Sequence, residues 1–325
     1  MPHDLATTNG RSAMMFYGTK PWHGLGTELD APATAAEAIS AAGLDYEVSL
    51  ASLTTSDGTP VPHRKAVLRN DANTVLGVVG NTYQPIQNAE AFGFLDNVVG
   101  KNSLEYHTAG ALGRGERIWM LAKLPGYIRV KNSDDITEKF LLLSNAHDGS
   151  AALRVFYTPI RVVCSNTLSL AHRKGLSQGL SIRHTGDLDE KIEEAREVLG
   201  IAYRYFECFA EQAEQLASYH PTPDQLKSYF EMIYPHRDGD ETRRTNNIHD
   251  ELTRLFEEGQ GQDIPQIRKS MWAALNAVTE YIDHQRPTRG QTPLVRANRR
   301  LESQWFGSGA KLKARAWETA LNIAS

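Results

Sequence analysis

The chain contains little cysteine. Two cysteines among 325 residues, Cys164 and Cys208, are too few for a disulfide framework or a cysteine-based zinc site. No apolar run approaches the roughly 18 residues that suggest a membrane span. The first ten residues, MPHDLATTNG, lack the basic and then apolar segments of a secretory signal. We therefore expect a cytoplasmic protein with no membrane partner.

Several common catalytic patterns are missing as well. The eleven histidines show no HxH or HExxH spacing, and no GxxxxGK[ST] phosphate loop occurs. Ser144 and Ser165 are not part of a GxSxG elbow. The glycines at 110, 113 and 115 precede an expected strand instead of opening a helix, so they do not fit a dinucleotide fingerprint. The sequence predicts no catalytic residue, metal ligand or cofactor.

The most structured stretch of the sequence spans residues 140–168. Apolar runs at 140–143, 152–157 and 160–164 are typical of neighbouring strands. The loop between the first two, SNAHDG at 144–149, ends in Asp-Gly, which favours a tight hairpin. Pro159 separates the second and third runs and indicates a sheet edge or a bulge.

The pattern along the chain predicts an α+β fold: a largely antiparallel sheet with helices on one face, followed by an all-α C-terminal module. Short period-two runs fill most of 44–185, and Asn88 caps an expected helix at 88–99. Acidic residues from Asp187 onward begin a series of amphipathic helical patterns. We therefore expect an N-terminal arm at 1–30, a sheet domain at 31–185 and a helical domain at 186–325.

Charge is segregated along the chain, although the net charge is only −4. Residues 149–186 contain no Asp or Glu, and strands do not easily hide like charges among themselves. A second basic cluster follows at 286–315, where Glu302 is the single acid. The basic residues that we expect to contact phosphates are Arg154, Arg161, Arg173, Lys174, Arg183, Arg296, Arg299 and Arg300.

Two interpretations of the basic residues remain open. They could bind nucleic acid, with Tyr83, Tyr106, Trp119 and Tyr157 as candidate stacking aromatics. Alternatively, the C-terminal cluster could pair with the acidic helices expected at 187–214 and 238–258. For that cluster the two interpretations carry equal weight.

Two other classes of function are also consistent with the sequence. A metal- or nucleotide-dependent enzyme could use a candidate polar pocket formed by Asn145, His147, Asp148, Asn166 and His184. A structural role of the 144–150 loop is the simpler alternative, because Asn and Asp commonly satisfy local backbone groups in turns. A host-protein-binding module could instead use the acidic helix at 187–214.

Several stretches resemble a known family. They are WHGLG at 22–26, VLGVVG at 75–80 with YQPI at 83–86, SNAHDGS at 144–150, 153–168, and IRHTG at 182–186, together with the late helices around 272–281 and 299–307. The chain resembles the phage/plasmid-like proteins catalogued as a domain of unknown function. The resemblance implies a mobile-element context, in phages, prophages or plasmids, and brings no catalytic residues. A fainter likeness, at the level of fold pattern, is to the single-strand annealing proteins of phages, which combine an antiparallel sheet, helices across one face and a basic groove.

Together these features predict a phage- or plasmid-encoded protein that binds nucleic acid without hydrolysing it. Single-stranded DNA, bound in replication or recombination, is the expected partner, and a homo-oligomer is an expected assembly.

Overall fold

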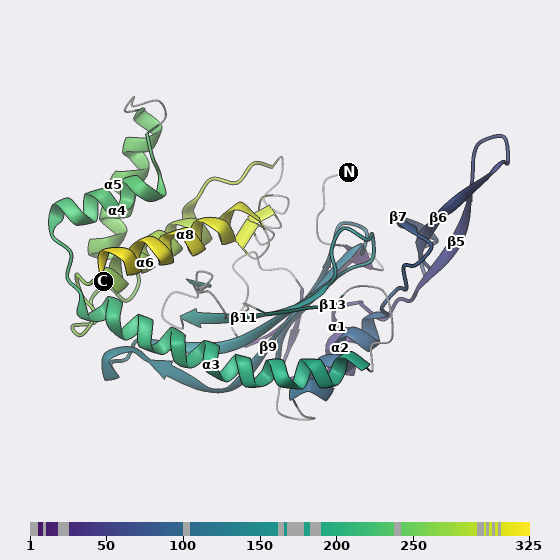
Figure 1. Ribbon diagram of the computed structural model, residues 1–325, viewed down its shortest axis with the longest axis horizontal. Helices are drawn as coiled ribbons and strands as arrows, with labels where there is room; N and C mark the ends of the chain where they lie inside the picture. Colours follow the sequence, from purple (N-terminus) through teal and green to yellow (C-terminus); the bar gives the residue numbers. More distant parts are fainter. Residues whose placement is uncertain are drawn as a thin grey trace.

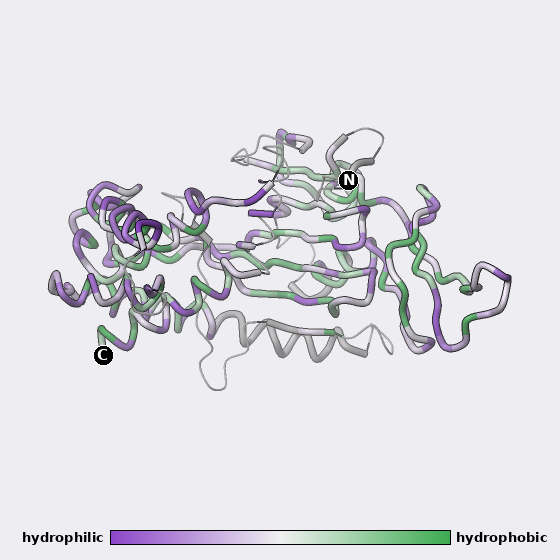
Figure 2. Tube along the Cα trace, turned by 90° about the horizontal axis from the view of Figure 1, so that it is seen from above, coloured by the Kyte–Doolittle hydropathy of each residue, from purple (hydrophilic) through white to green (hydrophobic). Residues whose placement is uncertain are grey.

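The computed structural model describes residues 6–8, 11–18, 26–99, 105–161, 166–167, 179–182, 190–236, 242–290, 296, 299–300, 303–304 and 307–325. Three parts follow one another along the molecule (Figure 1, Figure 2). Helices lie at one end, a large sheet lies in the middle, and a small sheet projects at the other end.

The large sheet has eight strands in the order β12-β11-β10-β9-β8-β3-β4, with β13 also paired to β11. Its pairs are antiparallel except β3 with β4. The strands are β3 (Met14–Tyr17), β4 (Thr27–Leu29), β8 (Glu105–Leu112), β9 (Arg117–Arg129), β10 (Ile136–Ala146), β11 (Leu153–Arg161), β12 (Asn166–Thr167) and β13 (Gly179–Ile182). The short strands β1 (Thr7–Thr8) and β2 (Arg11–Ser12) pair only with each other.

The middle strand β10 is apolar on both faces. Leu141 and Leu143 face one core cluster, and Phe140 and Leu142 face a second one that includes Trp119. All five side chains are at most 3% exposed. Burial on both faces explains why this strand is a continuous apolar run in the sequence and not an alternating one.

The small sheet is a three-stranded antiparallel meander of β5 (Val48–Thr54), β6 (Pro60–Arg69) and β7 (Thr74–Gly80). Its register shifts between Val67 and Leu68, so that Leu68 pairs with Val75 and Ala66 with Val78. Because paired residues point to the same face, this bulge turns Val75 and Val78 to one side. They are 43% and 51% exposed.

Helices α1, α2 and α3 lie on one side of the large sheet (Figure 1). Thr34 and Thr222 close capping boxes at the starts of α1 and α4, as the threonine-x-x-Glu/Gln spacing favours. The described helical elements are α1 (Ala35–Ala41), α2 (Asn88–Val99), η1 (Val130–Asn132), α3 (Glu190–Ser218), α4 (Pro223–Ile233), α5 (Arg243–Glu258), α6 (Met271–Glu280), the π-helical turn η2 (Tyr281–Gln285) and α8 (Ser308–Ile323). None of them is long and apolar enough to cross a membrane.

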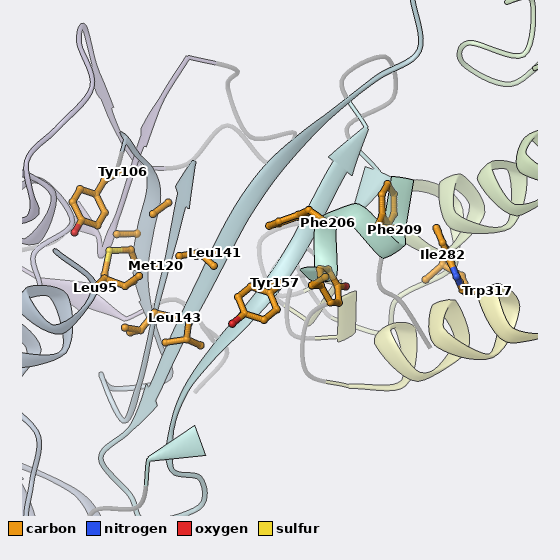
Figure 3. Close-up of a cluster of buried hydrophobic side chains, with 14 of the residues drawn as sticks. Leu95, Tyr106, Met120, Leu141, Leu143, Tyr157, Phe206, Phe209, Ile282 and Trp317 are labelled. Carbon is orange, nitrogen blue, oxygen red and sulfur yellow. The ribbon is translucent and has the colours of Figure 1, made fainter. Parts of the chain in front are cut away.

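One hydrophobic core continues from the sheet into the helices (Figure 3). Tyr157 of β11 lies 5.1 Å, centroid to centroid, from Tyr205 of α3. One turn further along α3, the Phe209 ring is 6.0 Å from Trp272 of α6 and 5.0 Å from Trp317 of α8. The long helix α3 therefore joins the sheet to the C-terminal helices by aromatic packing.

The structure confirms the α+β class, the largely antiparallel sheet and the helical C-terminal part. It also adds features that the sequence pattern did not predict. Residues 14–17 and 27–29, expected in an irregular arm, are strands of the large sheet. Residues 166–167 form the short strand β12. A single long strand, β9, covers residues 117–129 and continues through Pro125 and Gly126.

A buried hydrogen bond ties the helices to the sheet, and it generates a first prediction. The indole Nε1 of Trp272 donates to the buried Asp135 carboxylate at 2.6 Å. We expect Trp272→Phe to lower the free energy of unfolding by about 2–3 kcal/mol, because a hydrogen bond to a charged group is lost.

Urea denaturation measures this effect, and Trp317→Phe is the matched control. The Trp317 indole is equally buried but donates to the neutral amide oxygen of Gln212 at 2.7 Å. Trp317→Phe should therefore lower the free energy of unfolding by roughly 1 kcal/mol less than Trp272→Phe does. Equal costs would contradict the role given to the Asp135 charge.

Candidate functional site: a buried junction and an arginine surface

The polar loop at 144–150 lies where β10 ends, against the segment that leads into α2. His147 Nε2 is 2.8 Å from Asn88 Oδ1, and both side chains are buried. Asn88 Nδ2 donates to the Leu44 carbonyl at 2.8 Å, which fixes the orientation of the amide. Since Asn88 Oδ1 can only accept, Nε2 is the ring nitrogen of His147 that carries the hydrogen.

The same loop also packs against the small sheet. The Tyr83 hydroxyl donates to the carbonyls of Ala146 and His147, at 3.3 Å each. Gly77 of β7 faces the loop so closely that a Cβ there would lie 2.6 Å from the Cα of Asp148. Only glycine permits this approach. The sequence stretches 75–86 and 144–150, far apart in the chain, therefore meet at one contact.

Tyr46 and Arg69 extend this junction. The Tyr46 hydroxyl donates to the Gly115 carbonyl at 2.7 Å, and burial raises the pKa of Tyr46 to about 12. The Arg69 guanidinium lies 4.0 Å from the centre of the Tyr46 ring and donates to both carboxylate oxygens of Asp71, at 2.8 and 2.9 Å. The polar groups of the junction thus bind one another and hold the small sheet against the large one.

The candidate polar pocket is only partly brought together. Asn145 and His147 are fully buried, and Asp148 is half-buried beside them. The backbone of Asn166 pairs with Arg161 at the end of β11, and Arg161 pairs with Thr137 of β10. Thr137 is seven residues from Ser144, where the polar loop begins. That spacing corresponds to roughly 23 Å. His184 is outside the described residues, as is the side chain of Asn166.

The stacking role expected for three aromatic residues is wrong. Tyr106, Trp119 and Tyr157 are at most 4% exposed and belong to the core clusters. The fourth, Tyr83, is half-buried and is used in the junction. Periodicity could not distinguish these aromatics from surface ones, because both faces of the sheet are covered.

Most of the basic side chains between residues 149 and 186 that were predicted to contact phosphates lie outside the described part of the structure. Arg154 is exposed on β11. Arg161 ends the same strand, and only its backbone is described. Arg173, Lys174 and Arg183 lie outside the described residues. A GxSxG match at 175–179 leads into strand β13 and not into a helix, so it lacks the context of a nucleophile elbow.

The C-terminal arginines gather on the turn that follows η2. Arg296 donates to the carbonyl of Gly290 at 3.0 Å, Arg299 to that of Arg289 at 3.3 Å, and Arg300 to that of Asp283 at 3.3 Å. Arg296, Arg299 and Arg289 are exposed, whereas Arg300 is half-buried and burial lowers its pKa. We call Arg286, Arg289, Arg296, Arg299 and Arg300 the arginine surface.

Asp283 is bonded both to α8 and to the arginine surface. Its carboxylate accepts from Lys313 Nζ at 2.8 Å, and both side chains are 2% exposed. Its carbonyl accepts from Gln304 at 2.6 Å as well as from Arg300. Burial lowers the pKa of Lys313, while the Asp283 carboxylate acts in the opposite direction. One buried ion pair therefore connects η2, α8 and the segment that carries the arginines.

The acidic helices form several contacts of their own. Glu251 and Glu258 of α5 pair with Arg254 of the same helix. Glu214 of α3 accepts from the backbone N–H of Lys131. These carboxylates are thus engaged within their own helix or with the β9–β10 connection, and not with Arg296, whose described contact is a carbonyl.

Sequence reasoning missed Asp283 and Lys313. They are thirty residues apart, and an isolated Asp or Lys in an amphipathic pattern is usually exposed. A usable signal was that Asp283 directly follows the core residue Ile282. Among the described residues, no group of three or more His, Cys, Asp or Glu side chains is placed to hold a metal ion.

The fold and the site define an α+β protein with a basic C-terminal surface. The chain belongs to the family described as "Domain of unknown function (DUF932)", whose model matches residues 75–305. This match includes both sequence stretches of the junction and the arginine surface. No curated protein and no solved structure matches the chain.

The junction generates a second prediction. Asn88→Ala removes a partner of His147 and leaves the buried Leu44 carbonyl without its side-chain donor. We expect the free energy of unfolding to fall by about 2–4 kcal/mol, measured by urea denaturation. Asn81→Ala, at an exposed position, is the control and should stay within about 0.5 kcal/mol of wild type. A loss of under about 1 kcal/mol for Asn88→Ala would argue against a structural junction.

The buried ion pair generates a third prediction. Lys313→Met leaves the Asp283 carboxylate buried without its partner charge. We expect this change to lower the free energy of unfolding by about 3–5 kcal/mol. The double variant Asp283→Asn, Lys313→Met removes both charges at similar volume and should recover most of that loss. Thermal and urea unfolding of the two variants test this. A double variant as unstable as the single one would show that the charges do not act as a pair.

Proposed function

We propose that this protein binds nucleic acid, and single-stranded DNA in particular, without catalysing its hydrolysis. The observation that carries the proposal is the arginine surface, in which five arginines lie within residues 286–300 and three are held by main-chain carbonyls. A carbonyl orients a guanidinium without neutralising its charge. Cations held in this way suit the phosphate backbone, whose neutralisation releases counterions.

Further features support this proposal. Arg154 is exposed on β11 of the large sheet. The antiparallel sheet with the long helix α3 on one side resembles the layout that phage single-strand annealing proteins combine with a basic groove. That likeness favours single strands over duplexes. Arg161, Arg173, Lys174 and Arg183 belong to the proposal on their sequence positions.

The cellular setting that we propose rests on the resemblance to phage and plasmid proteins. We place the protein in the cytoplasm of a cell that carries a phage, prophage or plasmid, acting in replication or recombination as a homo-oligomer.

The rival enzyme class has less support. Asn145 and His147 are fully buried and bonded within the junction, so in this conformation they do not contact a substrate. The host-binding class has no described feature in its favour beyond the acidic sequence of α3.

Fluorescence anisotropy with labelled oligo-thymidine across a salt series tests the proposal. Arg289→Ala combined with Arg296→Ala removes two exposed guanidinium groups but keeps the Arg289 carbonyl that holds Arg299. We expect weaker binding and a salt slope that is lower by roughly 1.4, since each single-strand phosphate contact adds about 0.7.

The matched control removes two exposed cations elsewhere, Arg204 of α3 and Lys227 of α4. It makes the same change in net charge and should leave the affinity and the slope as in wild type. Equal effects of the two double variants would show that general charge, and not the arginine surface, determines binding. No salt-sensitive binding by the wild-type protein would rule out the proposed function.

A further inference from the structure

Tyr234 lies beside the arginine surface, at the point where four helical elements meet. It is the C-terminal cap of α4. Helix α4 packs against α5 and α8, and η2 packs against the same two helices. The Tyr234 ring lies edge-on to Tyr281 of η2, with the ring centres 5.7 Å apart. His249 of α5 lies 2.9 Å from the Tyr234 carbonyl and fixes this corner.

Three arginines from three elements surround this pair of tyrosines. Arg315 of α8 donates to the carbonyl of Ile233, the residue before Tyr234. The Arg286 backbone N–H donates to the Tyr281 carbonyl at 2.7 Å, and its side chain donates to Ser308 Oγ at 3.2 Å. Arg244 of α5 is exposed and acts electrostatically on Tyr281.

Arginines act electrostatically on both phenols. Burial raises the pKa of Tyr234, and Arg286 and Arg315 counteract that rise. Burial likewise raises the pKa of Tyr281, with Arg286 and Arg244 opposing it. Glu251, the acid that acts on Tyr281, already pairs with Arg254 at 2.6 Å. Because burial raises its pKa, the Tyr234 hydroxyl keeps its proton and can donate a hydrogen bond.

The Tyr234 hydroxyl has no hydrogen-bond partner among the described residues. Its oxygen is buried within this corner of the helices. A buried donor that is left unsatisfied costs about 1–3 kcal/mol. An anionic oxygen bound between the guanidinium groups would remove that cost, because it accepts from the hydroxyl and from arginine together. The Arg315 side chain, which donates to the Ile233 carbonyl next to Tyr234, is exposed.

We propose that Arg244, Arg286, Arg315 and the Tyr234 hydroxyl bind a phosphate group. Guanidinium groups from three elements together with a hydroxyl donor suit a tetrahedral ligand with several acceptor oxygens better than a planar carboxylate. The site continues the arginine surface, since Arg286 lies three residues before Arg289. This phosphate site rests on the proposed function: its phosphate belongs to the backbone of the bound nucleic-acid strand. Free phosphate is the alternative source.

Tyr234→Phe is the decisive variant, because it deletes only the unpartnered hydroxyl. Removal of an unsatisfied buried donor should leave stability unchanged or slightly higher, so the variant is expected to fold. Isothermal titration with inorganic phosphate should show binding to wild type that is about tenfold weaker in Tyr234→Phe, the effect of one hydrogen bond to a charged group. Tyr127→Phe, at an exposed tyrosine in the large sheet, is the matched control and should bind as wild type does.

Unchanged phosphate binding in Tyr234→Phe, or none in wild type, would overturn the assignment. The oligonucleotide titrations then identify the source of the phosphate. Tyr234→Phe should weaken oligo-thymidine binding about tenfold without changing the salt slope, because a neutral phenol releases no counterion. Arg286→Ala should weaken binding and also lower the slope by roughly 0.7.

The two proposals can fail separately. If wild type binds phosphate through Tyr234 but binds no oligonucleotide, the phosphate site stands with free phosphate as its ligand, and the proposed function fails. If oligonucleotide binding depends on Arg289 and Arg296 but not on Tyr234, the function stands and the phosphate site is wrong.

Discussion

The buried ion pair between Asp283 and Lys313 is the interaction on which the C-terminal surface depends. Two side chains with 2% exposure place opposite charges 2.8 Å apart, and the backbone carbonyl of the same Asp283 accepts from Arg300. The π-helical turn positions Asp283 so that its carboxylate meets α8 while its carbonyl meets Arg300 and Gln304. Breaking such a pair leaves a charge in a region of low dielectric constant, so the turn, α8 and the arginine segment are fixed together. Under the proposed function, arginines that are already held by main-chain carbonyls would lose less entropy when a strand binds.

The second constraint is the junction of the two sheets. Stretches 75–86 and 144–150 share no local sequence relation, yet Gly77 and Asp148 touch, and Tyr83 bonds to the carbonyls of Ala146 and His147. A packing role therefore accounts for the distinctive residues of both stretches. The loop that looked most like an active site holds the small sheet in place. Several of its buried polar groups are hydrogen-bonded within the junction, and the proposed binding surface lies in the C-terminal part of the chain.

The amount that could be predicted differs between the fold and the site. Period-two and continuous apolar runs predicted most strands of the two sheets, and capping and amphipathic patterns predicted α2 and the C-terminal helices, because these patterns are local. They did not give the bulge that turns Val75 and Val78 to one face, since register is decided by partners distant in sequence. The arginines at 296, 299 and 300 were identified from charge alone. The residues that hold these arginines could not be predicted, because Asp283 binds Lys313, which lies thirty residues away. The corner that contains Tyr234 and Arg286 likewise forms only when α4, α5 and α8 pack around η2.

The most direct test of the central claim, that a nucleic-acid strand binds at the arginine surface, is hydrogen–deuterium exchange of the full chain with and without saturating oligo-thymidine. We predict slower exchange concentrated in residues 284–304 and at the end of α4, with the junction around His147 unchanged because its amides are already protected. Protection confined to the small sheet or to α3, with none in 284–304, would contradict it and would place the binding surface elsewhere in the molecule.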